Sequence, residues 1–441
     1  MIETIVIALF AAGLILCIFC GWHVLVALVF GCFLFVGYAL WKQFTVRQIW
    51  KMSINGVRTI RTVLLLMLLI GMLTATWRAS GTVACIVYFS VGRIWPPAFL
   101  VMSFLLCCLM SFLTGTAFGA CATMGVVCMT MANALGIPAI FSGGAILSGI
   151  FFGDRCSPMS TSALLVAGLT QTDIYENMKG MVRTAAVPFI LTCLIYLAIG
   201  LFTPIQGQPT DVRTLFAQHF QMHWILLLPA VLIIVLSCLK VRVRTTMLLS
   251  IATACVLFLT IQKGNPAELA QILFCGYQAD APELAAMMNG GGILSMWKVM
   301  AIIFLSGIYA GIFQETGLLD GLKKRIALLE KRITPFGGVT LTSVVTCAVS
   351  CNQTLAIILS HQLCGDCTQE RSEMAMFLEN TAVVIAPLIP WSIAGAVPME
   401  TIGAPVACLT VACYLYLIPL WNGFLAVRYR KKQGKSVGLA S

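Results

Sequence analysis

Long apolar runs alternate with short polar segments along nearly the whole chain. Residues 5–19, 63–76 and 187–202 are almost continuous apolar runs. Because a helix needs roughly 20 mostly apolar residues to cross a bilayer, the pattern predicts an all-α polytopic membrane protein with about 10–13 membrane segments. The first run lacks the basic start and the small-residue cleavage site of a signal peptide, so we expect a retained span.

One polar run between two apolar flanks is the centre of the interpretation. It reads Gly-Asp-Arg-Cys-Ser-Pro-Met-Ser-Thr-Ser over residues 153–162. If its flanks lie in a bilayer, its carboxylate and guanidinium lie at membrane depth, where they need partners or a task. Non-helical backbone is tolerated at that depth only inside protein or along a watery cavity. The run therefore predicts a re-entrant hairpin with a transport site at Asp154.

The order of spans and breaks occurs twice, which indicates an internal repeat. The span pair at 5–41 corresponds to a pair at 224–261. Each copy then has a Gly-containing span, a span interrupted by small polar residues, a Pro-broken hairpin and a closing span. The interruptions are at 114–116 and 350–354, and the hairpin breaks are at 157–159 and 386–390. We predict a first repeat at 1–203, an external linker at 204–222, a second repeat at 223–421 and a basic tail at 422–441.

The distribution of Lys and Arg predicts the orientation of the two copies. These residues gather at 42–61, 240–244, 317–334 and 428–435, which the positive-inside rule places in the cytoplasm. The loops at 203–222 and 263–295 are poor in basic residues and are expected outside. Both termini are then cytoplasmic and the second copy is inverted relative to the first. Inverted repeats with broken helices are typical of secondary transporters, with the site at the midplane between the copies.

Composition supports the membrane interpretation and excludes other classes. The chain is 60% apolar and only 10% charged, whereas a soluble protein has about 25% charged residues. Its net charge of +11 comes from loops and tail, so it does not predict nucleic-acid binding. Thiols in apolar segments are usually packing residues, and no cofactor is expected apart from transported or coupling Na⁺ and H⁺. No GxxxxGK[ST] loop indicates ATP-driven transport.

Asp154 is the first candidate for transport chemistry. A buried carboxylate can hold a desolvated cation or take up a proton, and competition between Na⁺ and H⁺ for one such group would produce antiport. Ser157, Ser160, Thr161 and Ser162 supply hydroxyl oxygens of the kind that hard cations prefer. Asp154 and Ser157 are the candidate Na⁺ ligands.

A purely structural interpretation of these residues remains open. Asp154 could simply pair with Arg155, or with Arg78 or Arg93 at a helix end. Serine and threonine hydroxyls in membrane helices often only bond a neighbouring helix.

Further candidates lie at the two interruptions and on the second hairpin. At the interruptions they are Thr114, Thr116, Asn352, Gln353 and Thr354, and on the hairpin they are Glu379, Asn380 and Thr381. Glu379 is the natural second carboxylate, although it could instead lie at the cytoplasmic rim. His361 could carry a proton, because imidazole titrates near neutral pH, or it could be a packing residue.

Two sets of motifs resemble the NhaC family of Na⁺/H⁺ antiporters. The first comprises residues 152–160 together with Ala167-Gly168 and Thr172-Asp173-Ile174. The second comprises Asn352-Gln353, residues 378–381 and residues 386–391. The resemblance covers about residues 61–421. It implies two inverted repeats with re-entrant hairpins, sodium-coupled transport and a place in the bacterial inner membrane. Related folds are often dimers, so it also implies a homodimer.

The chain departs from the family pattern at its presumed site. The family hairpin usually reads Gly-Asp-Lys-x-Ser-Pro-Leu-Ser-Asp-Thr, whereas Arg155 replaces the Lys and no second Asp follows Ser160 here. The second hairpin usually has Glu-Asp, and here it has Glu379-Asn380. The family also contains malate–lactate exchangers and members linked to amino acids. The missing carboxylates therefore leave room for an organic anion held by Arg155, with Na⁺ as the coupling ion.

The leading hypothesis is a Na⁺/H⁺ antiporter that works by alternating access at Asp154. The alternative is a Na⁺-coupled transporter or exchanger of a small carboxylate or amino acid. An intramembrane aspartyl protease would need two facing aspartates, which this chain lacks, so we expect no enzyme. A channel is less consistent with two broken hairpins in inverted repeats. The expected partners are the lipid bilayer and a small ion or organic acid, with no nucleic acid.

Overall fold

The computed structural model describes residues 2–20, 24–90, 95–203, 209–239, 241–317, 334–365 and 367–437. Helices dominate this part of the chain, with one isolated bridge between Tyr277 and Gly290. The basic stretch that was expected in the cytoplasm lies outside the described residues at 318–333, as does the start of the linker at 204–208.

The described residues of the first half of the chain form twelve α-helices and two short helical segments. They are α1 (Ile2–Phe19), α2 (Val24–Trp41), α3 (Val46–Thr59), α4 (Arg61–Ala79), α5 (Thr82–Ser90), η1 (Pro96–Ala98), α6 (Phe99–Thr114), α7 (Ala117–Ala120), the π-helix η2 (Cys121–Gly125), α8 (Val126–Ala134), α9 (Ala139–Cys156), α10 (Thr161–Thr170), α11 (Ile174–Phe202) and α12 (Pro209–His219).

The second half repeats this alternation of long helices and short breaks. Its described elements are η3 (Trp224–Leu227), α13 (Leu228–Cys238), α14 (Val243–Thr260), α15 (Pro266–Cys275), α16 (Pro282–Met288), η4 (Ile293–Met296), α17 (Trp297–Thr316), α19 (Pro335–Ser350), α20 (Gln353–Cys364), α21 (Arg371–Asn380), α22 (Ala382–Ile385), η5 (Ala386–Leu388), α23 (Ile393–Ile402), η6 (Val406–Val411) and α24 (Cys413–Val437).

The helices confirm the predicted all-α polytopic membrane protein. Among the described residues, six helices are long and apolar enough to cross a membrane, and up to eight spans result if each of two bent pairs counts as one. Four shorter apolar helices accompany them. The predicted total of about 10–13 segments also counts short helices and hairpin arms.

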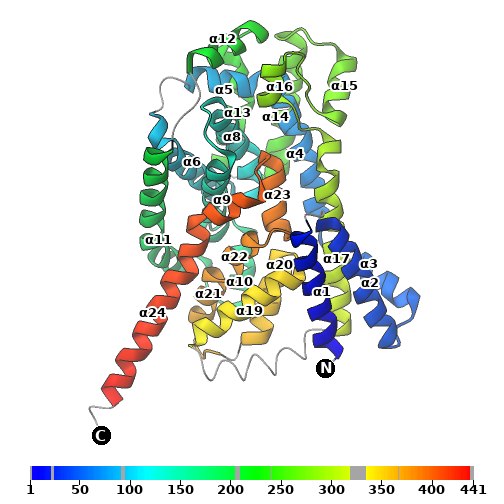
Figure 1. Ribbon diagram of the computed structural model, residues 1–441, viewed down its shortest axis with the longest axis vertical. Coiled ribbons are helices and arrows are strands. Elements are labelled where there is room, and N and C mark those ends of the chain that lie inside the picture. The colour runs from blue at the N-terminus through cyan, green and yellow to red at the C-terminus, as the bar shows by residue number, and fades with distance from the viewer. Residues whose placement is uncertain are drawn as a thin grey trace.

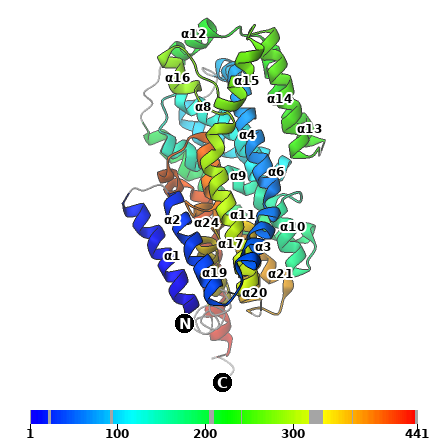
Figure 2. The same ribbon diagram turned by 90° about the vertical axis from the view of Figure 1, so that its right-hand side faces the viewer.

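The molecule is elongated, and both termini lie at one end (Figures 1 and 2). Helices α12, α15 and α16, which belong to the two regions expected outside, lie at the opposite end. The pair α1–α2 lies in the half near the termini, whereas α13–α14 lies in the other half. The inversion of the copies stays a prediction. The repeat boundaries, and which end faces the cytoplasm, stay predictions.

In each half of the chain, two consecutive helices pack against a long helix from the other half. Helices α2 and α3 pack against α17, and α14 and α15 pack against α4. The contact of α3 with α17 depends on glycine, because a Cβ on Gly56 would lie 2.0 Å from the carbonyl oxygen of Gly307. The two halves are therefore interleaved rather than merely placed end to end.

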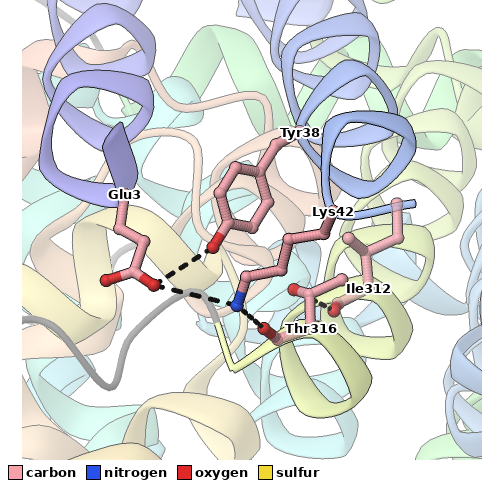
Figure 3. Close-up of polar contacts among 5 residues, drawn as sticks. All are labelled: Glu3, Tyr38, Lys42, Ile312 and Thr316. Carbon is pink, nitrogen blue, oxygen red and sulfur yellow. Dashed lines mark hydrogen bonds and ion pairs between the residues drawn. The ribbon is translucent and has the colours of Figure 1, made fainter. Parts of the chain in front are cut away.

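A small polar cluster fastens α1 and α2 to the end of α17 (Figure 3). Lys42 Nζ donates to the carbonyl oxygen of Thr316 at 2.7 Å and lies 3.8 Å from Glu3 Oε1. The Tyr38 hydroxyl donates to the same Glu3 oxygen at 3.2 Å. Because about a quarter to a third of the Glu3 and Lys42 side chains is exposed, this pair contributes little to stability, about 1 kcal/mol or less.

Candidate functional site

The first predicted interruption is a break between α6 and α7. Helix α6 ends at Thr114, Gly115 takes the left-handed conformation with φ 64°, and Thr116 is extended. Helix α9 packs along α6, and the turn after α9 is fastened to this break because Ser157 Oγ donates to the carbonyl oxygen of Phe112 at 2.8 Å. The interruption and the hairpin are thus one structural unit.

The second interruption has the same backbone geometry. Helix α19 ends at Ser350, Cys351 takes the left-handed conformation with φ 54°, and Asn352 is extended. The second hairpin is fastened here by Trp391, whose Nε1 donates to the carbonyl oxygen of Ala348 at 2.8 Å. In both copies the accepting carbonyl lies three residues before the left-handed residue.

Local sequence explains the first hairpin. A Cβ on Gly153 would lie 2.1 Å from the backbone carbon of Ser111, so only glycine allows α9 to seat this closely on α6. Pro158 lies between α9 and α10 and provides no backbone N–H. Ser160 then caps α10 by accepting bonds from the backbone N–H groups of Ser162 and Ala163, as serine does at helix starts.

Asp154 lies in the last turn of α9 and is buried, with 5% of its surface exposed. Its Oδ2 accepts hydrogen bonds from Ser162 Oγ at 3.0 Å and from Gln353 Nε2 at 3.1 Å, and Ser160 Oγ lies 3.3 Å from its Oδ1. No described cation forms an ion pair with it. Asp154 is therefore a buried carboxylate held only by neutral donors that come from both halves of the chain.

A cavity of about 330 Å³ is lined by Gln353, one of the residues that bond Asp154. Its polar lining comes from the start of α20, at Asn352, Gln353 and Thr354, and its apolar lining includes Phe118 and Ile393. Gln353 lines the cavity and also belongs to the surroundings of Asp154. Its side-chain amide donates to Asp154 and to the carbonyl oxygen of Val383. Gln353 thus links the cavity to the buried carboxylate.

Arg155 points away from Asp154 and is fully buried. Its Nε donates to the carbonyl oxygen of Glu379, its Nη1 to Cys156 Sγ and the carbonyl oxygen of Met181, and its Nη2 to Thr184 Oγ1 and Asn380 Oδ1. A guanidinium has five N–H groups, so every one of them has an acceptor here. Arg155 is a fixed positive charge that ties α9, α11 and α21 together.

Glu379 is also buried but, unlike Arg155, its charged group has no hydrogen-bond partner among the described residues. Its side chain is 0% exposed, and neither carboxyl oxygen has a hydrogen-bond partner among the described residues. It is close enough for its charge to interact with those of Arg155 and Asp154. The structure buries the Glu379 side chain completely, and whether the residue lies in the transport pathway or at the cytoplasmic rim stays a prediction.

The structure brings together some predicted site residues and separates others. Asp154, Ser160 and Gln353 form one cluster, and Arg155, Asn380 and the Glu379 backbone form another. The remaining candidates do not contact Asp154 through their side chains. Ser157 and Thr114 bond backbone carbonyls, Thr381 bonds Ser343 and the Phe377 carbonyl, and Asn352 caps α20. The side chains of Thr161, Thr116 and Thr354 form no hydrogen bond with Asp154 in the described part of the chain.

The arginines proposed as partners of Asp154 have other roles. Arg155 bonds the residues of the second cluster, and Arg78 donates to the carbonyl oxygen of Asn289. Arg93 lies outside the described residues. His361 lines a separate polar cavity of about 310 Å³ with Gln171 and Arg371.

Sequence reasoning missed Thr184 and the carbonyl oxygen of Met181 as partners of Arg155. Both lie inside α11, where a single threonine in an apolar helix gives no signal of a long-range contact. Ser162 was recognised only as one of several nearby hydroxyl groups, and the structure makes it a direct donor to Asp154.

The oxygen-rich surroundings of Asp154 suit a hard cation as cargo. The described residues contain no group of three or more His, Cys, Asp or Glu side chains that could hold a metal. Na⁺ does not need such a group, because hydroxyl, amide and carbonyl oxygens can serve beside one carboxylate. Ser160, Ser162 and Gln353 supply such atoms within hydrogen-bond distance of Asp154 or of one another.

An all-helical membrane protein with two matching helix breaks and buried charges between them has the architecture of a secondary transporter. A family model described as the Na⁺/H⁺ antiporter family matches residues 149–425, more than half of the chain, and the chain belongs to this family. The chain is thus an NhaC-type secondary antiporter and not an enzyme, which confirms both predictions.

Individual relatives span most of the chain. It is 26% identical to the Na⁺/H⁺ antiporter NhaC of Alkalihalophilus pseudofirmus, over 93% of this chain and 90% of that protein. It is 25% identical to the malate-2H⁺/Na⁺-lactate antiporter of Bacillus subtilis, over 85% of this chain and 81% of that protein. It is also 25% identical to the arginine/ornithine antiporter ArcD of Halobacterium salinarum, over 77% of this chain and 73% of that protein.

Proposed function

We propose that this protein exchanges Na⁺ for H⁺ by alternating access, with the two ions competing for Asp154. The observation that carries the proposal is a buried carboxylate that has only neutral donors among the described residues, one of which, Gln353, also lines a cavity. Such a carboxylate is stabilised by a bound cation or by a proton, since an ionised group without a counter-charge is costly in a dry interior. Either ion can satisfy it, which is the requirement for exchange.

The arrangement around Asp154 also supports alternating access. Its donors come from α10 in the first half of the chain and from α20 in the second half. A site built between two halves can be opened to either side when one half moves against the other. The matched breaks at Gly115 and Cys351 provide each half with its own non-helical element at this place.

Exchange of a small carboxylate or amino acid is the alternative, and the names of two relatives favour it. In that case Arg155 would be expected to hold the anionic group of the substrate. Its five N–H groups are already bonded to protein acceptors, so it offers no free donor. This saturation supports the cation as the primary cargo.

Everted membrane vesicles from cells without their own antiporters test the proposal. The vesicles are energised to an acid interior, and NaCl, KCl or LiCl is added while a pH-sensitive dye reports the gradient. We expect NaCl to collapse the gradient with the wild type and not with Asp154→Asn. Glu176→Gln is the matched control, because Glu176 is an exposed carboxylate on α11 that pairs with Lys179, and it should behave like the wild type.

Two results would contradict the proposal. The first is an Asp154→Asn protein that is correctly inserted and still collapses the gradient. The second is a wild type that responds to none of the three cations. In the second case, counterflow of labelled malate, lactate and arginine in the same vesicles would identify an organic-solute exchanger.

A further inference from the structure

A second cavity, of about 520 Å³, lies in the half of the molecule away from the termini (Figure 1). Helices α4, α5, α6, η2, α8 and α13 contribute its walls, and none of the described residues that line it is charged. We propose that this cavity takes up one acyl chain of a membrane phospholipid whose phosphate lies at Arg213. The site is separate from Asp154, so the inference does not depend on which solutes are exchanged there.

The polar side chains in the cavity wall are already bonded to other parts of the protein. Trp77 Nε1 donates to Ser250 Oγ at 2.9 Å, and Thr123 Oγ1 donates to the carbonyl oxygen four residues earlier at 2.8 Å. The Cys128 thiol interacts with that of Cys107. A hydrophilic ligand needs polar partners in its cavity, whereas a hydrocarbon does not. The walls therefore suit a hydrocarbon.

The size and flexibility of the walls suit a long chain rather than a small apolar molecule. An apolar cavity of about 150 Å³ takes up benzene, and this one is several times larger. Four of its lining residues are methionines, Met102, Met110, Met124 and Met131. Methionine side chains are unbranched and adapt to irregular shapes, so these walls can follow an acyl chain in more than one conformation.

The cavity opens sideways, through the wall of the protein that faces the bilayer. Met102 and Leu106 of α6, and Val231 and Ile234 of α13, line the cavity and are also exposed at the surface. Helix α6 belongs to a candidate membrane span, and α13 belongs to one of the two bent pairs. An acyl chain can therefore enter from the lipid between these two helices without passing through water.

Aromatic side chains mark the end of the cavity where the head group would lie. Phe89 lines the cavity and stacks on Trp224 with 3.8 Å between the ring centres. Trp224 is exposed at the start of η3, just before α13. Exposed tryptophan at a helix end is typical of the boundary between a membrane and water. This end of the cavity is therefore expected at the level of the lipid head groups.

A cation lies at the same end. The Arg213 guanidinium on α12 lies 4.8 Å from the centre of the Tyr88 ring, and Tyr88 is adjacent to Phe89. Helix α12 is bent by 102° from the following helix and buries Phe216 while Arg213 stays exposed, as in a helix that lies along a membrane surface. Arg213 forms no ion pair in the described part of the chain. Its guanidinium can therefore bind a phosphate.

The inner end of the cavity reaches the π-helix η2, which follows the first helix break. Thr123 and Met124 of η2 line the cavity. The same π-helix packs against α23, and Cys121 Sγ donates to the carbonyl oxygen of Pro398 at 3.5 Å. Apolar walls gain dispersion contacts from an occupant that fills the space between them. The acyl chain would thus support the segment that joins the first break to the second hairpin.

The experiment uses the full-length protein in liposomes that contain phosphatidylglycerol with a photoactivatable diazirine at the end of one acyl chain. Labelled residues are located by peptide mass spectrometry in the wild type, Ala230→Phe and Ala252→Phe. We expect the wild type to carry label on Val127 and Cys128, which line the cavity but are buried from the surrounding lipid. Ala230→Phe places a ring in the cavity wall and should lose this label while the exposed faces of α6 and α13 stay labelled.

The controls separate a phospholipid from other occupants. Ala252→Phe adds the same bulk at an exposed position on α14 outside the cavity wall, so its labelling should match that of the wild type. Arg213→Gln should decrease the label on Val127 and Cys128, and a free fatty acid with the same diazirine chain should label these residues less than the phospholipid does. If Ala230→Phe does not fold, competition by excess unlabelled phosphatidylglycerol in the wild type replaces it and should remove the same label.

Three results would overturn the inference. The first is a wild type that carries label only on exposed residues, as it would if a second copy of the chain or no acyl chain filled the cavity. The second is unchanged label on Val127 and Cys128 in folded Ala230→Phe, or under competition by the unlabelled lipid. The third is equal labelling by the fatty acid together with no effect of Arg213→Gln, which would show that no phosphate is bound.

Discussion

The two hairpins of the molecule share a backbone plan and differ in chemistry. Each is fastened to a helix break by one hydrogen bond to a carbonyl, from Ser157 in the first and from Trp391 in the second. Each begins its second arm with a serine cap, at Ser160 and Ser392. The first carries the adjacent charges of Asp154 and Arg155 at its turn, whereas the second has an uncharged, Pro-rich turn and carries its carboxylate earlier, at Glu379 on α21.

This difference distinguishes the residues that form the hairpins from the residues that carry charge. The hairpins and breaks are formed by glycine, proline and capping residues, which act equally in both copies. The charges are present at only some of the equivalent places, and they make contacts across the copies. The helix breaks and hairpins are thus alike in the two halves of the chain, whereas the charged residues are at different places in each. Three tests with four substitutions probe this distinction, in order of expected effect.

Arg155→Met should have the largest effect. It removes five donors from a buried place, and the Met181 carbonyl and the Asn380 side chain lose the donor that ties them to α9. We expect a loss of stability of about 3–5 kcal/mol, seen as a lower unfolding temperature of the purified protein in size-exclusion chromatography after heating. Arg155→Lys is the matched control, since it keeps the charge with fewer donors. Its unfolding temperature should lie between those of the wild type and Arg155→Met. Wild-type stability in Arg155→Met would show that the guanidinium does not hold the hairpins together.

Gln353→Leu should have an intermediate effect that is specific to transport. It removes a donor from Asp154 and from the Val383 carbonyl and leaves the other donors to Asp154, Ser160 and Ser162, in place. Hydrogen bonds to charged groups contribute about 1.5–3 kcal/mol, so the sodium concentration for half-maximal exchange should rise about tenfold or more. Thr354→Ala changes the next residue in the cavity wall and should leave that concentration unchanged. If both variants behave alike, Gln353 is not part of the cation site.

Ser157→Ala and Trp391→Phe should have the smallest effects, and these should be similar to each other. Each removes one neutral hydrogen bond between a hairpin and a helix break, which contributes about 1 kcal/mol. We expect small decreases in unfolding temperature, additive in the double variant, with sodium exchange preserved. A large decrease in unfolding temperature with only one of the two variants would show that the two hydrogen bonds are not equivalent.

Local sequence was sufficient to predict the helices and the places where they break. The interruptions at 114–116 and 350–354 and the hairpin turns at 157–159 and 386–390 all coincide with observed helix ends. Glycine, proline and small polar residues in an apolar background give a strong signal, because each changes the backbone directly. Asp154 as the centre of a polar cluster followed from the same signal, although its role in transport is still a proposal.

The partners of the charged residues could not be predicted in the same way. In a membrane protein both the lipid-facing and the buried sides of a helix are apolar, so the sequence does not show which way a helix is turned. Asp154 and Arg155 are adjacent in α9, and adjacent residues on a helix do not face each other. One therefore meets α10 and α20 and the other meets α11 and α21, so the alternative interpretation in which the two residues pair with each other is wrong.

The saturation of Arg155 also has a consequence for inhibitor design. A compound with a carboxylate would find no free N–H on this guanidinium. A compound with an amidinium or ammonium head group would find Gln353, which lines the cavity of about 330 Å³ and donates to Asp154. The apolar walls at Phe118 and Ile393 would suit a compact aromatic body behind that head group.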